Sequence, residues 1–285
     1  MERTIEYLRE KMAQFLRKGD RVIICFANEK ETDLGSMFAK AVDACGAVPI
    51  NWGDDHRWKT LLRLVFGYRG CTLVAPPLVI LGLSKLARAT ATPLNISNAV
   101  MAGYPCTDWM IKGIRSGLDC KSWGCFDVGH PSVAAGFSCQ QGNGVHVNSN
   151  IFRVRICDEL DQPVPSGKLG AVVLEDVKDG TILRTCDRGR IGDSPCGCGS
   201  TDPLLLDLAL GNNVDFELLA LSNSINRWTS VLDCRIQRGE NGLEIEIVVF
   251  PGEKLPKLPT CAKLVVRPWN AEVDEPFVVN VQKTL

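Results

Sequence analysis

The first 130 residues alternate short apolar runs with amphipathic runs, and this alternation constrains the fold more than any other feature of the chain. The apolar runs have the length of buried strands, and they cover 21–26, 48–50, 71–75, 96–102 and 120–126. Helical periodicity fills the segments between them, at 2–17, 33–45, 55–67, 77–88 and 107–117. Strands that alternate with helices pair in parallel, because each helix crosses back over a face of the sheet. The sequence therefore predicts an α/β fold, a parallel sheet with flanking helices.

After about residue 130 the pattern changes to short strands separated by turns. Strand-like runs cover 144–147, 151–157, 170–175 and 181–184. Many short strands of this kind are typical of a small antiparallel or barrel-like unit. We therefore expect three domains: an α/β sheet domain over 1–130, a β-barrel-like subdomain over 131–220, and a short C-terminal α+β or β unit over 221–285.

A hairpin is the clearest local signal in the last unit. The strand-like runs 228–236 and 243–250 flank a turn at Glu240-Asn-Gly242. Isoleucines alternate with glutamates in the second run, which indicates a sheet with one exposed face. Further strand-like runs follow at 263–267 and 277–281.

Composition excludes several classes of protein. The chain is 45% hydrophobic and 23% charged with a net charge of −1, which is typical of a globular protein. It has no basic run that would indicate a nucleic acid or an anionic membrane as partner. The longest apolar run, Leu73–Leu83, is too short to cross a bilayer, and no signal peptide is visible. We expect a cytoplasmic protein.

Thirteen cysteines are many for a chain without an export signal, and some thiolates bound to metal in a reducing compartment explain them better than a disulfide scaffold. Cys139 and His146 flank a Gly-rich turn, and Cys196 and Cys198 lie in a Cys-Gly-Cys-Gly segment. Three thiolates and one imidazole suit tetrahedral Zn²⁺, and four protein ligands indicate a structural zinc site. The alternative is that these residues are small core side chains.

Three segments of the second half, Gly167–Leu174, Leu183–Asp187 and Cys196–Thr201, carry a family resemblance. They resemble phenylacetate–coenzyme A ligase and its adenylate-forming (AMP-binding) relatives, and the resemblance runs from about Gly19 to the mid-200s. It implies ATP or AMP and Mg²⁺ as ligands. It also implies the family's metal site at the pairs Cys139/His146 and Cys196/Cys198.

The same resemblance assigns nucleotide-binding roles to single residues. The turn that surrounds the adenine is matched by Ala102, Gly103, Tyr104 and Pro105. Asp187 matches the aspartate that accepts hydrogen bonds from the ribose hydroxyls.

Several catalytic groups of the family are not matched. Gly129 stands where the family has the glutamate that helps to hold Mg²⁺, and Asp127 or Asp193 are the only substitutes that we consider. We also expect the family's phosphate loop and its C-terminal catalytic lysine to be absent.

Two functions therefore remain open. The first is a homologue of adenylate-forming enzymes that binds an acyl or nucleotide ligand without full adenylation activity. The second is an active acid–CoA ligase for an aryl or fatty acid, which would use substitute residues or a partner chain. Loss of several catalytic groups that act as a unit favours the first. A homodimer or a complex with a partner subunit is left open.

Overall fold

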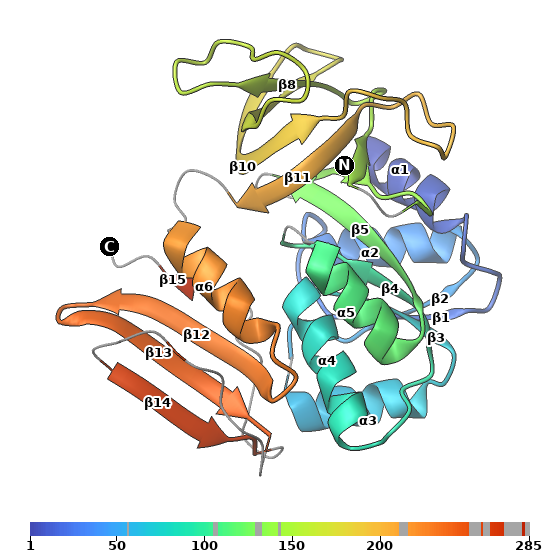
Figure 1. Cartoon of the computed structure of the whole chain (residues 1–285). Helices are drawn as coiled ribbons and strands as arrows, with labels where there is room; N and C mark the ends of the chain where they lie inside the picture. Colours follow the sequence, from blue (N-terminus) through green and yellow to red (C-terminus); the bar gives the residue numbers. More distant parts are fainter. Residues whose placement is uncertain are drawn as a thin grey trace.

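The computed structural model describes residues 1–55, 57–104, 108–128, 133–141, 144–210, 216–250, 258, 263–270 and 281–282. Its main element is an eleven-stranded mixed sheet in the order β2-β1-β3-β4-β5-β6-β7-β11-β10-β9-β8. A second, smaller mixed sheet lies in the C-terminal part of the chain. Together they make an α/β protein (Figure 1).

The first five strands form the parallel part of the large sheet. They are β1 (Arg21–Ile24), β2 (Val48–Asn51), β3 (Cys71–Ala75), β4 (Ile96–Met101) and β5 (Lys121–Val128). Helix α1 (Glu2–Met12) precedes them, and the helices between them are α2 (Leu34–Ala44), α3 (Trp58–Gly67), α4 (Pro77–Ala89) and α5 (Asp108–Leu118). The predicted parallel sheet with flanking helices is confirmed.

Side-chain alternation along the strands divides the core into two layers. Val22 and Ile24 of β1 belong to the apolar cluster that contains α1 and α2. Ile23, between them, belongs to the cluster that contains α3, α4 and α5. The inner strands β1 and β3 are therefore buried on both faces, as their continuous apolar runs require, whereas β2 at the edge of the sheet is partly exposed.

The first helix is shorter than the sequence predicts, because it ends at Met12 instead of continuing to residue 17. Its periodic pattern continues to Phe15, but this side chain leaves the helix and stacks on Trp123 of β5, with 4.6 Å between the ring centroids. Contact with the sheet therefore outweighs helical periodicity at this end.

The antiparallel strands continue the same sheet. They are β6 (Val133–Phe137), β7 (Val145–Val147), β8 (Phe152–Cys157), β9 (Gly170–Asp176), β10 (Ile182–Ile191) and β11 (Leu204–Leu210). β5 is the junction, because residues 121–124 pair in parallel with β4 and residues 125–128 pair antiparallel with β6. The sheet is thus continuous across residue 130, and the domain boundaries stay a prediction.

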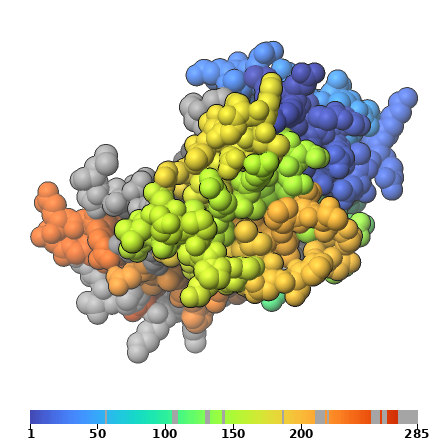
Figure 2. All heavy atoms as spheres, turned by 90° about the horizontal axis from the view of Figure 1, so that it is seen from above, coloured from blue at the N-terminus to red at the C-terminus, as the bar shows by residue number. Residues whose placement is uncertain are grey.

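Sequence reading missed two of these strands, β6 and β11, and ended β10 too early. β10 runs to Ile191 because β11 pairs along its second half, from Asp187–Leu210 to Ile191–Leu205. In Figure 2 the antiparallel region covers the face that is seen from above, with the N-terminal helices beside it and the C-terminal unit extending away.

The C-terminal unit consists of α6 (Phe216–Asn226) on a sheet of β12 (Val231–Gly239), β13 (Gly242–Val249) and β14 (Lys263–Pro268), with the two-residue β15 (Val281–Gln282) beside β12. The predicted hairpin is confirmed, since β12 and β13 pair up to Gly239 and Gly242. Helix α6 was not predicted. Among the described helices, none has the length and apolar character to cross a membrane.

Candidate functional site

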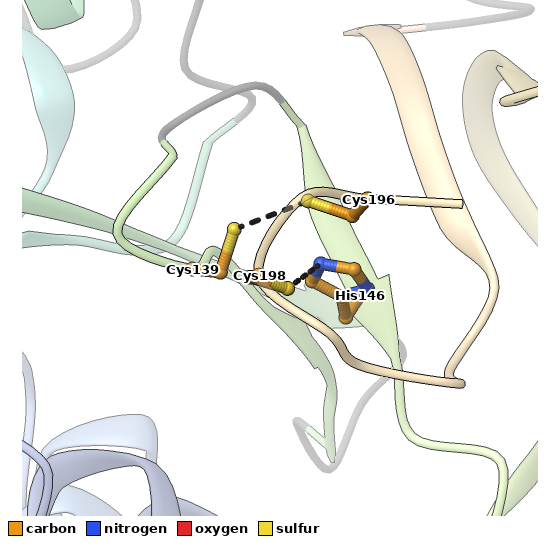
Figure 3. A group of neighbouring side chains, drawn as sticks. All are labelled: Cys139, His146, Cys196 and Cys198. Atoms are coloured by element: carbon orange, nitrogen blue, oxygen red, sulfur yellow. Dashed lines mark hydrogen bonds between the residues drawn. The ribbon is translucent and has the colours of Figure 1, made fainter. Parts of the chain in front are cut away.

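Cys139, His146, Cys196 and Cys198 form one cluster, in which the four ligand atoms lie within 4.8 Å of one another. The Sγ atoms of Cys139 and Cys196 are 3.6 Å apart, and Cys198 Sγ is 3.3 Å from His146 Nε2. Figure 3 shows the four side chains pointing toward a common centre. The structure thus brings together all four residues that the sequence proposed as metal ligands.

Three separate elements carry the cluster. Cys139 follows β6, and His146 is the central residue of β7. Cys196 and Cys198 lie in the connection between β10 and β11, where the Gly199 N–H donates to the Cys196 carbonyl at 3.1 Å and Gly199 has a φ of +80°. A positive φ favours glycine, so the Cys-Gly-Cys-Gly sequence suits this tight turn. Pairing of His146 with Leu204 of β11 then places the turn beside the imidazole.

The donor set fits a tetrahedral metal ion. Zn²⁺ with Zn–S bonds of ~2.3 Å and Zn–N bonds of ~2.0 Å has S···S edges of ~3.8 Å and S···N edges of ~3.5 Å. The observed separations of 3.6 Å and 3.3 Å are close to these edges. The His146 Nδ1 atom lies 3.1 Å from the Asp202 carbonyl, so its N–H donates there and leaves Nε2 with a lone pair that faces the thiols. The cluster could therefore hold a metal such as zinc.

Hydrogen bonding makes one thiol of the cluster unusually acidic. The backbone N–H of Cys198 and then the neighbouring Cys198, His146 and Cys139 side chains lower the pKa of Cys196 to about 7. A metal ligand must be a thiolate, and a lowered thiol pKa reduces the free energy needed to remove its proton. His146 itself is buried, with 3% of its surface exposed, whereas Cys198 is exposed.

A cleft of about 770 Å³ lies at the carboxyl ends of β4 and β5. Its walls come from the large sheet, from the first turns of α5 and from α6. The polar side chains that line it are those of Tyr104, Trp109, Lys112, Asp127, Ser138, Arg184, Thr185, Asp187, Asp207, Asn223 and Arg227. The carboxyl ends of parallel strands are the usual place for ligands in such sheets.

Some of the residues predicted to bind a nucleotide line the cleft, and others do not. Gly103, Tyr104 and Asp187 line this cleft together, although they come from different elements. Ala102 is fully buried, and its N–H donates to the Ala75 carbonyl, so it supports the turn without lining the cleft. Pro105 lies outside the described residues.

Two carboxyl groups face the cleft near the Gly103 turn. Asp127 accepts a 2.7 Å hydrogen bond from the N–H of Gly103, and burial raises the pKa of its carboxyl. Burial, followed by the charge of Asp127, raises the pKa of Asp187 to about 6, against a smaller lowering by its hydrogen bond with Thr185. Of the two substitutes considered for the missing glutamate, Asp127 is therefore in the cleft. Asp193 instead lies beside Gly167, outside the lining.

Sequence reading missed the side of the cleft that α5 and α6 build. Trp109, Lys112 and Arg227 belong to it. A helix directly after a predicted ligand-binding turn was a usable signal for the first two, because its first turn must lie near that ligand. No local signal pointed to Arg227, since the helix that it directly follows was not predicted.

No protein-family model and no curated protein sequence matches this chain. Solved structures do match. A 2-hydroxyisobutyryl-CoA ligase in the postadenylation state, in complex with 2-HIB-AMP, superposes with a TM-score of 0.76 at 14% identity over 98% of this chain and 70% of that chain. An anthranilate CoA ligase in complex with anthranoyl-AMP gives a TM-score of 0.60 at 11% identity over 94% and 61%.

An amide bond synthetase from Marinactinospora thermotolerans gives a TM-score of 0.54 at 14% identity, over 93% of this chain and 61% of that chain. The likeness covers nearly all of this chain in each case, and identities of this size establish the fold and not the reaction. Over most of its length, the chain has the fold of the adenylate-forming enzymes.

Proposed function

We propose that this protein is a divergent, cytoplasmic homologue of the adenylate-forming enzymes that binds an acyl or nucleotide ligand in the cleft without the full adenylation reaction. The observation that carries the proposal is that Asp187 and the Gly103-Tyr104 turn face one cleft of about 770 Å³. That volume suits a nucleotide-sized ligand. The structural neighbours named with an acyl-AMP ligand support this choice.

Each polar group has a role in this proposal. Asp187 accepts hydrogen bonds from the two ribose hydroxyls, which one carboxylate can accept together. Tyr104, which is half-buried at the end of the turn, packs against the base. The Cys/His cluster, with zinc bound, holds the connection of β10 and β11 against β7 and so keeps Asp187 on its strand in place.

The carboxylates of the cleft explain why we propose binding and not adenylation. Adenylation develops negative charge on the α-phosphate, and bound Mg²⁺ is one group that stabilises it. Asp127 is the described carboxyl at the end of β5, but it already accepts a bond from Gly103, and its raised pKa disfavours the charged form that Mg²⁺ requires. Asp207 forms an ion pair of 2.5 Å with Arg190.

The second candidate is an active acid–CoA ligase of the phenylacetate type. It is favoured by the neighbours themselves, which include two CoA ligases in complex with acyl-AMP ligands. In this case Mg²⁺ would be held by Asp127 or by a partner chain.

Calorimetry with AMP and ATP, with and without Mg²⁺, tests the proposal together with a pyrophosphate-release assay on a panel of aryl and fatty acids. We expect nucleotide binding, at least about tenfold weaker in Asp187→Asn because a bond to a charged acceptor is lost, and no pyrophosphate. Asp193→Asn is the matched control, since that carboxylate lies outside the cleft. Mg²⁺-dependent pyrophosphate release would replace the first candidate with the second. Absence of binding by nucleotides and by every acid of the panel would exclude both.

A further inference from the structure

The charged groups of the cleft lie on two different walls. The carboxyls of Asp127 and Asp187 belong to the wall that β5 and β10 build. Lys112 of α5 and Arg227, which directly follows α6, belong to the other wall. Figure 1 shows α6 next to the end of β11. The C-terminal sheet lies on one side of α6, and α5 lies on the other side. The cleft is therefore suited to a ligand with hydroxyl groups at one end and negative charge at the other.

Arg227 is held in position by an aromatic contact. Its guanidinium lies over the Trp109 ring, 5.6 Å from the centroid, so the residue that directly follows α6 contacts a side chain of α5. A guanidinium that stacks on an indole keeps its N–H donors free at its edge. Asn223 of α6 also lines the cleft, and its carbonyl accepts a hydrogen bond of 3.2 Å from the backbone N–H of Arg227.

The same contact brings an unused donor to this wall. The indole Nε1 of Trp109 is buried, and within the described part of the chain it has no hydrogen-bond partner. A buried donor without a partner costs free energy, which a ligand acceptor would recover. Trp109 and Lys112 are three residues apart and share one face of α5, in its first turns, where the helix dipole favours negative charge.

The two cations of this wall are not neutralised by acidic side chains among the described residues. Arg184, the third basic residue of the lining, forms an ion pair with Asp161, and Asp207 is paired with Arg190. Lys112 and Arg227 appear in no ion pair of the described residues. Both side chains are exposed, so an incoming anion can reach them.

We propose that Lys112 and Arg227, with the Trp109 indole N–H, form a binding site for the phosphate group of the ligand. A guanidinium fork, an ammonium and a neutral N–H together offer several donors and two positive charges, which match a doubly charged phosphate better than a single carboxylate. The choice of a nucleotide as the phosphate-bearing ligand rests on the proposed function. The phosphate site itself rests on the contacts above.

Calorimetry with inorganic pyrophosphate tests the site without a nucleotide. The full-length protein should bind pyrophosphate, and more weakly as ionic strength rises. The double variant Lys112→Gln/Arg227→Gln should lose about tenfold or more in affinity for pyrophosphate. Lys112→Gln/Arg227→Lys, which keeps the positive charge at residue 227, should regain part of that affinity. Arg63→Gln is the control, because it removes one positive charge from an exposed position on α3 outside the cleft.

The outcomes separate this site from the proposed function. No binding of pyrophosphate to the unmodified protein, or an equal loss in Arg63→Gln, overturns the site. Tighter binding of AMP than of adenosine, with the difference abolished in the double variant, supports both. Pyrophosphate binding that the double variant loses, together with no binding of AMP or adenosine, supports the phosphate site and rejects the nucleotide.

Discussion

The ammonium of Lys85 in α4 donates a hydrogen bond of 2.6 Å to the carbonyl of Asn226, the last residue of α6. It donates a second bond of 2.8 Å to the carbonyl of Val231 in β12. Burial lowers the pKa of Lys85 to about 8, while the nearby Asp233 acts in the opposite direction. The C-terminal unit, and with it the α6 wall of the cleft, is therefore anchored to α4 by this buried side chain, in addition to the apolar packing of Leu232, Val248 and Phe250 against the helices of the parallel layer.

Lys85→Met should loosen this anchor. The variant leaves two buried carbonyls without their donor and removes the cation next to Asp233, so we expect the free energy of unfolding to fall by about 2–4 kcal/mol. Hydrogen exchange should show β12 and α6 exchanging faster. Arg88→Met on the same helix, whose side chain is exposed, should leave both measurements unchanged. Equal exchange in Lys85→Met and the unmodified protein would contradict the anchor.

The raised pKa of Asp187 predicts that the stability of the protein depends on pH. Its pKa of about 6 in the folded protein lies above the ordinary value of 3.8, so the folded state disfavours the charged carboxylate. The resulting loss of stability is fully present above pH 6 and disappears as the pH falls from 6 toward 3.8. Asp187→Asn should therefore be more stable than the unmodified protein at pH 8, by about 1–2 kcal/mol after allowance for solvent screening.

Urea unfolding at pH 8 and at pH 4 measures this difference. The gain in the free energy of unfolding that Asp187→Asn gives should shrink toward zero at pH 4, because the Asp187 carboxyl is then neutral in the folded protein and no charge is buried. A gain of the same size at both values would show that the charge of Asp187 is not its cause.

Removal of the metal should destabilise both the Cys/His cluster and helix α1. Elemental analysis should find close to one zinc per chain, and Cys198→Ser should lose most of it. The Tyr7 hydroxyl of α1 donates to the His146 carbonyl at 3.1 Å, so a chelator should also speed hydrogen exchange in α1. Cys45→Ser, outside the cluster, should keep its zinc. A chain without zinc would reject the metal site.

Gly82→Ala should overpack the layer between α3 and α4. A Cβ at Gly82 would overlap the ring of Trp58, which is 1% exposed and has no room to move. We expect a loss of about 1–3 kcal/mol in the free energy of unfolding. Gly67→Ala, at the end of α3, meets no atom within 4 Å and should be neutral or slightly stabilising. Equal midpoints of thermal unfolding for the two variants would contradict this packing.

The sequence by itself determined the parallel layer, the β12–β13 hairpin and the membership of the Cys/His cluster. The strands and helices of the first 130 residues could be predicted because apolar periodicity is a local property that near neighbours produce. The hairpin could be predicted because a two-residue turn joins its strands. The four ligands were recognisable because few residue types suit zinc, and the family resemblance paired them.

Only the tertiary structure decided the rest. β11 is inserted between β7 and β10, and this long-range pairing extends β10 and brings the Cys196 turn to His146. The cleft joins Lys112 of α5 to Arg227, which directly follows α6. These two residues are far apart in the chain, and the docking of the C-terminal unit on the parallel layer brings them together. Contacts of this kind depend on which surfaces pack together across the whole chain, and no local pattern of residues encodes them.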